Sequence, residues 1–84
     1  MFKNKGKEGK NNICGEKIAN LRMSMVPKTS QRQLADKLQL IGIDIDKNAI
    51  QRIECGKRFV TDIEIYAFCQ IFDITPNELF DYNK

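Results

Sequence analysis

Residues 46–58 have the sequence DKNAIQRIECGKR and contain the clearest helical pattern in the chain. Asp46 suits an N-cap and Gly56 is typical of a helix end, so the pattern predicts a helix from Lys47 to about Glu54. At about 100° per residue, one side of this helix carries amides and cations, and the opposite side carries apolar residues. The polar side consists of Lys47, Asn48, Gln51 and Arg52, and the apolar side consists of Ala49, Ile50 and Ile53.

The polar side of this helix has the chemistry that recognises base edges in DNA. Asn and Gln side chains hydrogen-bond adenine in the major groove, and Lys and Arg side chains hydrogen-bond guanine. No carboxylate occurs among the four polar residues. A short amphipathic surface helix with a solvated polar side would show the same pattern, so this segment alone leaves both interpretations open.

The length and composition indicate one small folded domain. The chain has 84 residues, of which 42% are hydrophobic, and its mean hydropathy is −0.45. No apolar run approaches the roughly 20 residues of a membrane-spanning helix. Lysines near the N-terminus are not followed by an apolar segment, which argues against a secretory signal. We therefore expect a cytoplasmic protein without a membrane partner.

The charge is unevenly distributed along the chain. Residues 1–27 carry a net charge of +4, residues 28–58 carry +3 and residues 59–84 carry −4. A basic middle and an acidic end suit an anionic partner bound by the middle of the chain. The alternative is that this uneven charge only keeps the protein soluble.

The residues that usually build metal sites and catalytic centres are scarce. The chain has no histidine and three cysteines, none of them in a C-x-x-C pair. A zinc site would lack a usual ligand set, so we expect no metal and no cofactor. Cys14 and Cys69 suit apolar helix faces, whereas Cys55 follows the predicted helix, and a redox role for it stays open. Without a nucleophile–base pair or a phosphate-binding glycine loop, we expect a protein that is not an enzyme and binds no small molecule.

The remaining pattern predicts an all-α domain of five helices. Residues 1–12, MFKNKGKEGKNN, cannot bury apolar surface, so we expect a flexible basic N-terminal arm before a domain at 13–84. Three helix starts have the S/T-x-x-E/Q spacing of a capping box, and three have a hydrophobic staple. The predicted helices cover about 13–25, 30–40, 47–54, 61–72 and 75–82.

In this order and spacing, the chain resembles the lambda-repressor-like (Cro-type, XRE-type) helix-turn-helix DNA-binding domain. The similarity covers about residues 13–80. It rests on SQRQLA at 30–35, on AIQRIE at 49–54 with the Gly-Lys pair that follows it, and on ITPNELF at 74–80. The resemblance implies a compact five-helix bundle in which the helix at 47–54 enters the major groove and the helix at 30–40 crosses the backbone.

The resemblance also assigns roles to individual residues. Lys47, Asn48, Gln51 and Arg52 would face bases or neighbouring phosphates, and Gln31, Lys57 and Arg58 would contact the phosphate backbone. Arg22 and Glu54 would form a structural ion pair. The alternative is that Glu54 is exposed and has no partner. The implied function is a sequence-specific transcriptional regulator, expected to repress and to bind double-stranded DNA as a homodimer.

The sequence departs from the family pattern in two links. The link through residues 40–45 is several residues longer than the usual tight turn, and the link around residues 27–29 is slightly long. The first insertion bears on the docking angle, and therefore on which polar residues reach bases. An antitoxin-like or other protein-interaction module with the same fold is the alternative function, because the chain offers no separate sensor domain.

Overall fold

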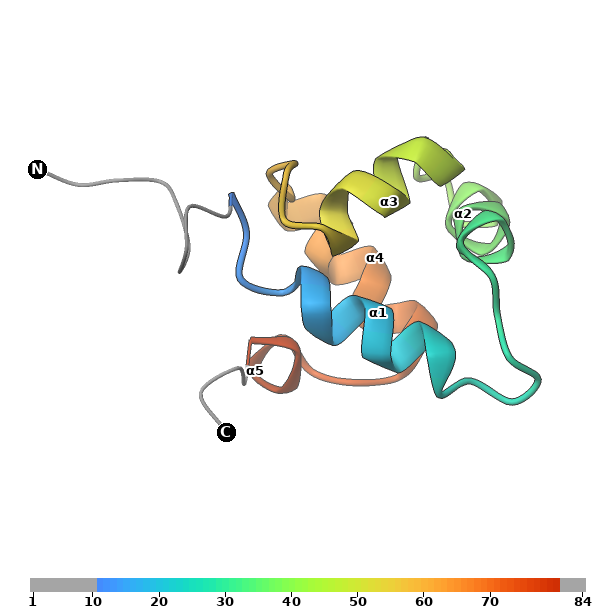
Figure 1. Ribbon diagram of the computed structural model, residues 1–84. Coiled ribbons are helices and arrows are strands. Elements are labelled where there is room, and N and C mark those ends of the chain that lie inside the picture. Colours follow the sequence, from blue (N-terminus) through green and yellow to red (C-terminus); the bar gives the residue numbers. More distant parts are fainter. Residues whose placement is uncertain (1–10, 81–84) are drawn as a thin grey trace, which may run out of the picture.

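The computed structural model describes residues 11–80, and these residues form five α-helices and no strand. The helices are compactly arranged, as the sequence pattern predicts for an all-α fold (Figure 1). In chain order they are α1 (Gly15–Met23), α2 (Gln31–Leu40), α3 (Lys47–Glu54), α4 (Asp62–Phe72) and α5 (Pro76–Leu79). None of the helices within these residues is long and apolar enough to cross a membrane.

The helix starts are fixed by side chains next to them in sequence. Each of the three predicted capping boxes is present, so in each case the cap side chain accepts a backbone N–H and the N3 side chain bonds back to the cap N–H. α3 begins differently, with Asp46 Oδ1 accepting from Ala49 N at 2.8 Å. The capping residues are Ser30 with Gln33, Thr61 with Glu64, Thr75 with Glu78, and Asp46.

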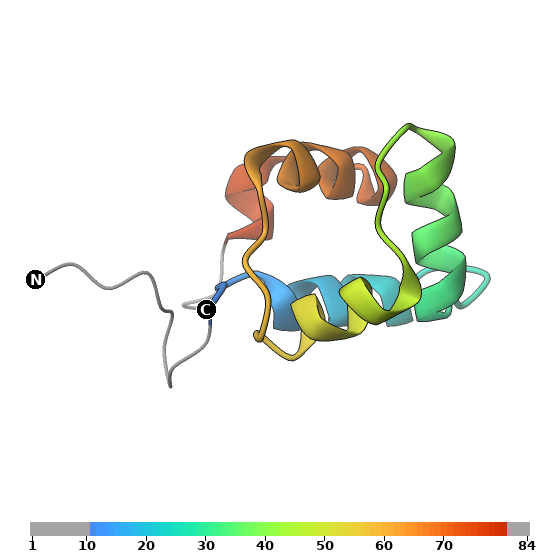
Figure 2. The ribbon, with the colours of Figure 1, turned by 90° about the horizontal axis from the view of Figure 1, so that it is seen from above.

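One apolar core joins the five helices. Viewed from above, α1 and α3 lie along one side, α4 lies along the other, and α2 closes one end (Figure 2). The side chains between them form a single cluster that every helix enters, which gives each helix a defined rotation about its axis. Its buried members are Cys14, Ile18, Leu34, Ala35, Leu38, Ile45, Ile50, Ile53, Ala67, Phe68, Cys69 and Leu79.

The long link between α2 and α3 is ordered by backbone and side-chain hydrogen bonds. Gly42, with φ of 89°, reverses the chain after α2 in a conformation that favours glycine. Gln39 Nε2 then donates to the carbonyl of Ile45 at 3.1 Å, and the side chains of Ile45 and Ile50 are both buried in the core cluster. The additional residues therefore lead into a fixed start for α3.

Two helices are shorter than the sequence suggested. α1 runs from Gly15 to Met23, whereas 13–25 was expected, because the chain already leaves the helix at Ser24 on its way to Pro27. Within the described residues α5 ends at Leu79 with Phe80 as its C-cap.

The predicted basic arm falls mostly outside the described residues. Residues 1–10 are not described, but Asn11 and Asn12 are, and both are hydrogen-bonded to the segment that follows α3. For these two residues the expectation of a flexible arm is wrong, because their amides have backbone partners that the sequence does not reveal.

Candidate nucleic-acid interface

The packing of α3 against the rest of the domain leaves one side of this helix facing solvent. Ile50 and Ile53 are fully buried, and α3 packs against both α1 and α2. Its start is fixed by the Asp46 cap, and its end by Gly56, whose φ of 82° lets the chain turn away after the helix. The rotation of α3 is therefore set by the core.

The outward side of α3 is formed by Lys47, Asn48, Gln51 and Arg52, which we call the polar face of α3. All four residues are exposed. Among residues 11–80, none of their side chains has a hydrogen bond or ion pair. The structure thus brings together the four residues that the sequence predicts as base-reading, with their donors and acceptors available to a ligand.

The one carboxylate of α3 is turned inward and neutralised. Glu54 Oε2 accepts from Arg22 Nε at 2.7 Å, and its Oε1 accepts from another guanidinium nitrogen of Arg22 at 3.0 Å. The same guanidinium donates to the carbonyl of Thr29 at 3.1 Å. The two charged side chains retain only 14% and 7% exposure. The sequence-predicted pair is therefore present, and it ties α3 to α1 and to the start of α2.

Gln31 belongs to this same network. Its Nε2 donates to Glu54 Oε1 at 2.9 Å, so the amide predicted to hold a phosphate is already bound within the protein. The residue is half-buried, at the first turn of α2. Its observed contact fixes the N-terminus of α2 against the C-terminal end of α3.

The two basic residues after α3 have different surroundings. The Lys57 side chain is exposed, and within the described residues it is in no ion pair. Arg58 instead forms a two-pronged ion pair with Glu64, with N–O distances of 2.9 and 3.0 Å. This hydrogen bonding raises the pKa of the Arg58 guanidinium. Burial alone would raise the pKa of Glu64, but the bonds from Arg58 and Thr61 lower it below its usual value.

Asn11 and Asn12 form a clamp on the exit of α3 that the sequence did not reveal. Asn12 Nδ2 donates to the carbonyls of Ile53 and Arg58, at 3.0 and 2.8 Å, and its Oδ1 accepts from the backbone N–H of Gly15. Asn11 contributes two further bonds to the backbone of residues 56 and 57. The carbonyl partners lie more than 40 residues away in sequence, so no local pattern signals them.

Gly15 allows the clamp to close. A Cβ atom at this position would lie 2.0 Å from the carbonyl oxygen of Ile53, so only glycine lets the start of α1 approach the last turn of α3 this closely. The end of α3 is thereby held by backbone contact with α1 as well as by the Arg22–Glu54 pair.

A shallow groove of about 250 Å³ runs between α2 and the start of α3. It adds Arg32, an exposed cation of α2 that sequence reasoning did not select, to the vicinity of Lys47. Its position at the second residue of α2 was the available signal, because helix starts are common sites of phosphate contact. The groove is lined by Arg32, Ala35, Asp36, Gln39, Asp46 and Lys47.

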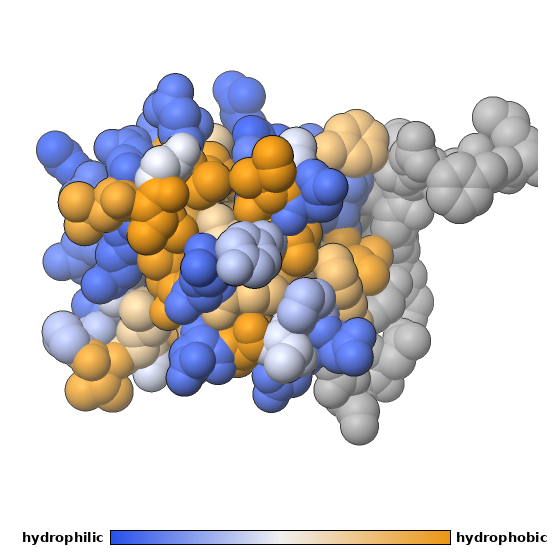
Figure 3. Space-filling model, turned by 180° about the vertical axis from the view of Figure 1, so that it is seen from behind, coloured by the Kyte–Doolittle hydropathy of each residue, from blue (hydrophilic) through white to orange (hydrophobic). Residues whose placement is uncertain are grey.

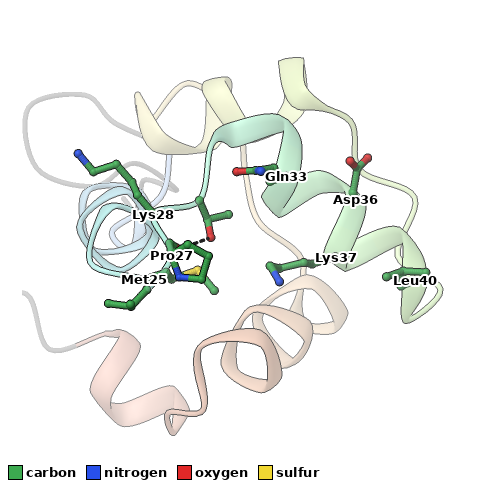
Figure 4. A pocket seen from close by; sticks show the side chains of 9 residues that line it. Met25, Pro27, Lys28, Gln33, Asp36, Lys37 and Leu40 are labelled. Atoms are coloured by element: carbon green, nitrogen blue, oxygen red, sulfur yellow. Dashed lines mark hydrogen bonds between the residues drawn. The ribbon is translucent and has the colours of Figure 1, made fainter.

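A second depression, of about 310 Å³, lies beside the link between α1 and α2 (Figure 4). The hydroxyl of Thr29 donates to the carbonyl of Pro27 on its wall, at 3.3 Å. Figure 4 shows the Lys37 side chain in this depression, directed away from α3. The link between α1 and α2 thus shapes a surface separate from the polar face of α3. The lining residues are Met25, Val26, Pro27, Lys28, Thr29, Gln33, Asp36, Lys37 and Leu40.

Comparisons with protein-family models, with curated proteins and with solved structures found no match to this chain. The functional argument therefore rests on the residues and geometry described above.

Proposed function

We propose that this protein is a sequence-specific regulator of transcription that binds double-stranded DNA through a lambda-repressor-like helix-turn-helix formed by α2 and α3. In this proposal α3 enters the major groove and α2 lies across the phosphate backbone. The observation that carries the proposal is the polar face of α3, with two cations and two amides exposed on one side of a firmly anchored helix. These are the side chains that pair with guanine and adenine edges.

The anchoring of α3 supports a role in recognition. Base readout requires side chains held in a fixed register against the duplex, since a misplaced amide loses its hydrogen bonds. The Arg22–Glu54 pair and the clamp of Asn11 and Asn12 hold the end of α3, and Asp46 holds its start. Because Glu54 is paired, its negative charge is shielded from an approaching phosphate.

We assign the direct phosphate contacts to Lys57 and Arg32. Both are exposed cations, one in the segment after α3 and one in the groove between α2 and α3. Gln31 and Arg58, which the resemblance also places at the backbone, are each hydrogen-bonded to a glutamate. In this proposal Gln31 fixes the start of α2, and Arg58 fixes the segment after α3, in position against the phosphate backbone of the DNA.

Selection of bound duplexes from a random pool tests the proposal directly. The selected site should bind at least ~10³-fold more tightly than random duplex at the same salt concentration. Affinity should also fall steeply as salt rises, because displaced counterions leave the DNA. Equal affinity for selected and random duplexes, measured by fluorescence anisotropy, would refute sequence-specific binding.

Single substitutions separate base contacts from phosphate contacts. Asn48→Ala should relax sequence preference at one position of the site, at a cost of about 1–3 kcal/mol against the selected duplex. Lys57→Ala should instead weaken all duplexes about equally and reduce the salt slope by about 1. Lys37→Ala is the matched control, because this side chain points away from α3 (Figure 4) and its removal should change neither quantity appreciably.

A further inference from the structure

The side of α4 that faces solvent carries apolar side chains in its middle and an acid at each end. Ile63 and Tyr66 are 65% and 64% exposed, although both are large hydrophobic residues. Viewed from behind, the side of the molecule that α4 covers shows hydrophobic side chains among the polar ones (Figure 3). Exposed apolar residues gathered on a small domain mark an interaction surface. We call this surface the exposed stripe of α4, and it consists of Asp62, Ile63, Tyr66, Gln70 and Asp73.

The surroundings of this stripe are acidic. Residues 59–80 contain four acids and neither lysine nor arginine. Two of the acids are used within the fold, because Glu64 is paired with Arg58 and Glu78 bonds back to the cap of α5. Asp62 and Asp73 are exposed and are in no ion pair among the described residues. The stripe therefore presents an uncompensated carboxylate at each end.

Asp73 stands where a helix favours the opposite charge. It is the C-cap of α4, whose last turn contains no basic residue. The C-terminus of a helix carries the negative end of the helix dipole, so an acid there is unfavourable and a cation is favourable. A cation supplied from outside the chain would relieve this repulsion.

The charge pattern also decides against a second copy of the same stripe. Two such stripes packed antiparallel would place Asp62 of each chain beside Asp73 of the other, and parallel packing would place each acid beside its own counterpart. Both arrangements bring like charges together in a partly desolvated contact, which costs free energy. The partner that complements the stripe is instead cationic at its ends and apolar between them.

We infer that the exposed stripe of α4 docks a basic amphipathic helix of a different protein. Asp62 and Asp73 are eleven residues apart, or about 16 Å along the helix axis. A partner helix lying along α4 matches both acids with lysines or arginines eleven residues apart. Apolar residues at the fourth and seventh positions after the first cation then lie on the same side of the partner, opposite Ile63 and Tyr66.

The inference goes beyond the proposed function. Viewed from above, α4 runs along the side of the molecule opposite α3 (Figure 2). The partner helix and a DNA duplex therefore approach different sides, and both can be bound together. Docking on the stripe requires neither DNA nor the polar face of α3.

Fluorescence anisotropy of a labelled synthetic peptide tests the inference without DNA. The probe is an alanine- and glutamine-rich peptide of about 18 residues, long enough to be helical in water. It carries two lysines and two leucines in the spacing given above. It should bind with a Kd of about 10–100 μM at low salt. A sister peptide with both lysines replaced by glutamate, and another with both leucines replaced by glutamine, should each bind at least about 10-fold more weakly.

Two substitutions locate the bound peptide. Ile63→Gln removes the apolar anchor without changing the charge, and it should weaken binding by at least about 10-fold. Asp73→Asn should weaken binding several-fold at low salt and not at high salt. Asparagine tolerates the positive φ of 57° at this position. Because the variant also removes an acid from a helix C-terminus, its thermal stability should not fall below that of the wild type.

α2 offers a matched control for each substitution. Asp36→Asn removes one exposed acid away from the stripe, and Leu40→Gln removes a leucine that is 86% exposed. Both variants should bind the peptide like the wild type. If Asp36→Asn weakens binding as much as Asp73→Asn does, net charge alone attracts the peptide and the inference is overturned.

Three other results would also overturn the inference. These are a wild type that does not bind the lysine peptide, a glutamate peptide that binds equally well, and binding that persists in Ile63→Gln. Sedimentation equilibrium adds a fourth, because self-association that Ile63→Gln abolishes would assign the stripe to a second copy. Since no DNA is present, failure to find a selected duplex would refute the proposed function and leave these results unchanged.

Discussion

Replacing both members of the Arg22–Glu54 pair should cost far less stability than the two single replacements suggest. Glu54→Leu alone leaves the Arg22 guanidinium, 14% exposed, with only the Thr29 carbonyl as partner. Arg22→Leu alone leaves the Glu54 carboxylate, 7% exposed, with only the Gln31 amide. Each single change strands a largely buried charge, which costs about 3–5 kcal/mol.

The double variant Arg22→Leu/Glu54→Leu removes both charges together. What remains is the loss of hydrogen bonds at Thr29 and Gln31, each worth about 0.5–1.5 kcal/mol, offset by new apolar burial. We therefore expect a net cost of about 1–3 kcal/mol, several kcal/mol less than the sum of the single variants. A domain of this size has a total stability of about 4–13 kcal/mol, so either single variant should be close to unfolding at the low end of that range.

Urea unfolding followed by far-UV circular dichroism measures these costs. Arg32→Leu is the control, because Arg32 is exposed and is in no ion pair among the described residues, so its replacement should change stability by less than about 0.5 kcal/mol. If the double variant costs as much as the two singles added together, the pair has no coupling energy and the reasoning is refuted.

Three further measurements follow from the geometry of individual residues. Glu64→Gln should cost about 1–2 kcal/mol at neutral pH, by weakening the ion pair with Arg58 and the helix cap. Folding lowers the pKa of Glu64, so its carboxylate stabilises the folded protein above the unfolded-state pKa of about 4.3. This stabilisation is lost as pH falls through the folded-state pKa. The unfolding curves of wild type and variant should therefore converge in acid. Alkylation of the native protein should modify only the exposed Cys55, because the other two thiols are buried and burial raises the pKa of Cys14 to about 11. Labelling of Cys14 before the protein unfolds would contradict this prediction. Gly15→Ala should lower the free energy of unfolding, measured by thermal unfolding, by at least about 2 kcal/mol, because the new Cβ atom meets a backbone carbonyl. Gly42→Ala should lower it by only about 1–2 kcal/mol, because the space around Gly42 is open and only its positive φ is unfavourable for alanine. Equal small losses of stability in the two variants would contradict the close approach at Gly15.

The helix starts were predictable because their signals are local. A capping box needs only two side chains three residues apart, and all three boxes form as the spacing predicts. The exposure of the polar face of α3 was also predictable, since Ile50 and Ile53 must enter the core and the opposite side then faces out.

The partners of the other site residues were harder to predict because they depend on distant segments. Gln31 bonds to Glu54, 23 residues away, and the Asn12 amide bonds to carbonyls 41 and 46 residues away. An amide near a helix start can bind a phosphate, a side chain or a backbone carbonyl equally well, and only the packed fold selects among these partners. Arg58 is a different case, since its partner Glu64 lies only six residues away, in the first turn of α4, and already serves as a capping residue.

The clamp of Asn11 and Asn12 defines how far the chain can be trimmed. A protease cut or a shortened expression product beginning at Ile13 would still contain all five helices. It would nevertheless remove the asparagine donors from four backbone carbonyls around the end of α3, and the acceptor from the N–H of Gly15. The minimal folding unit is therefore longer than its helices, and two asparagines with no apolar surface set its boundary.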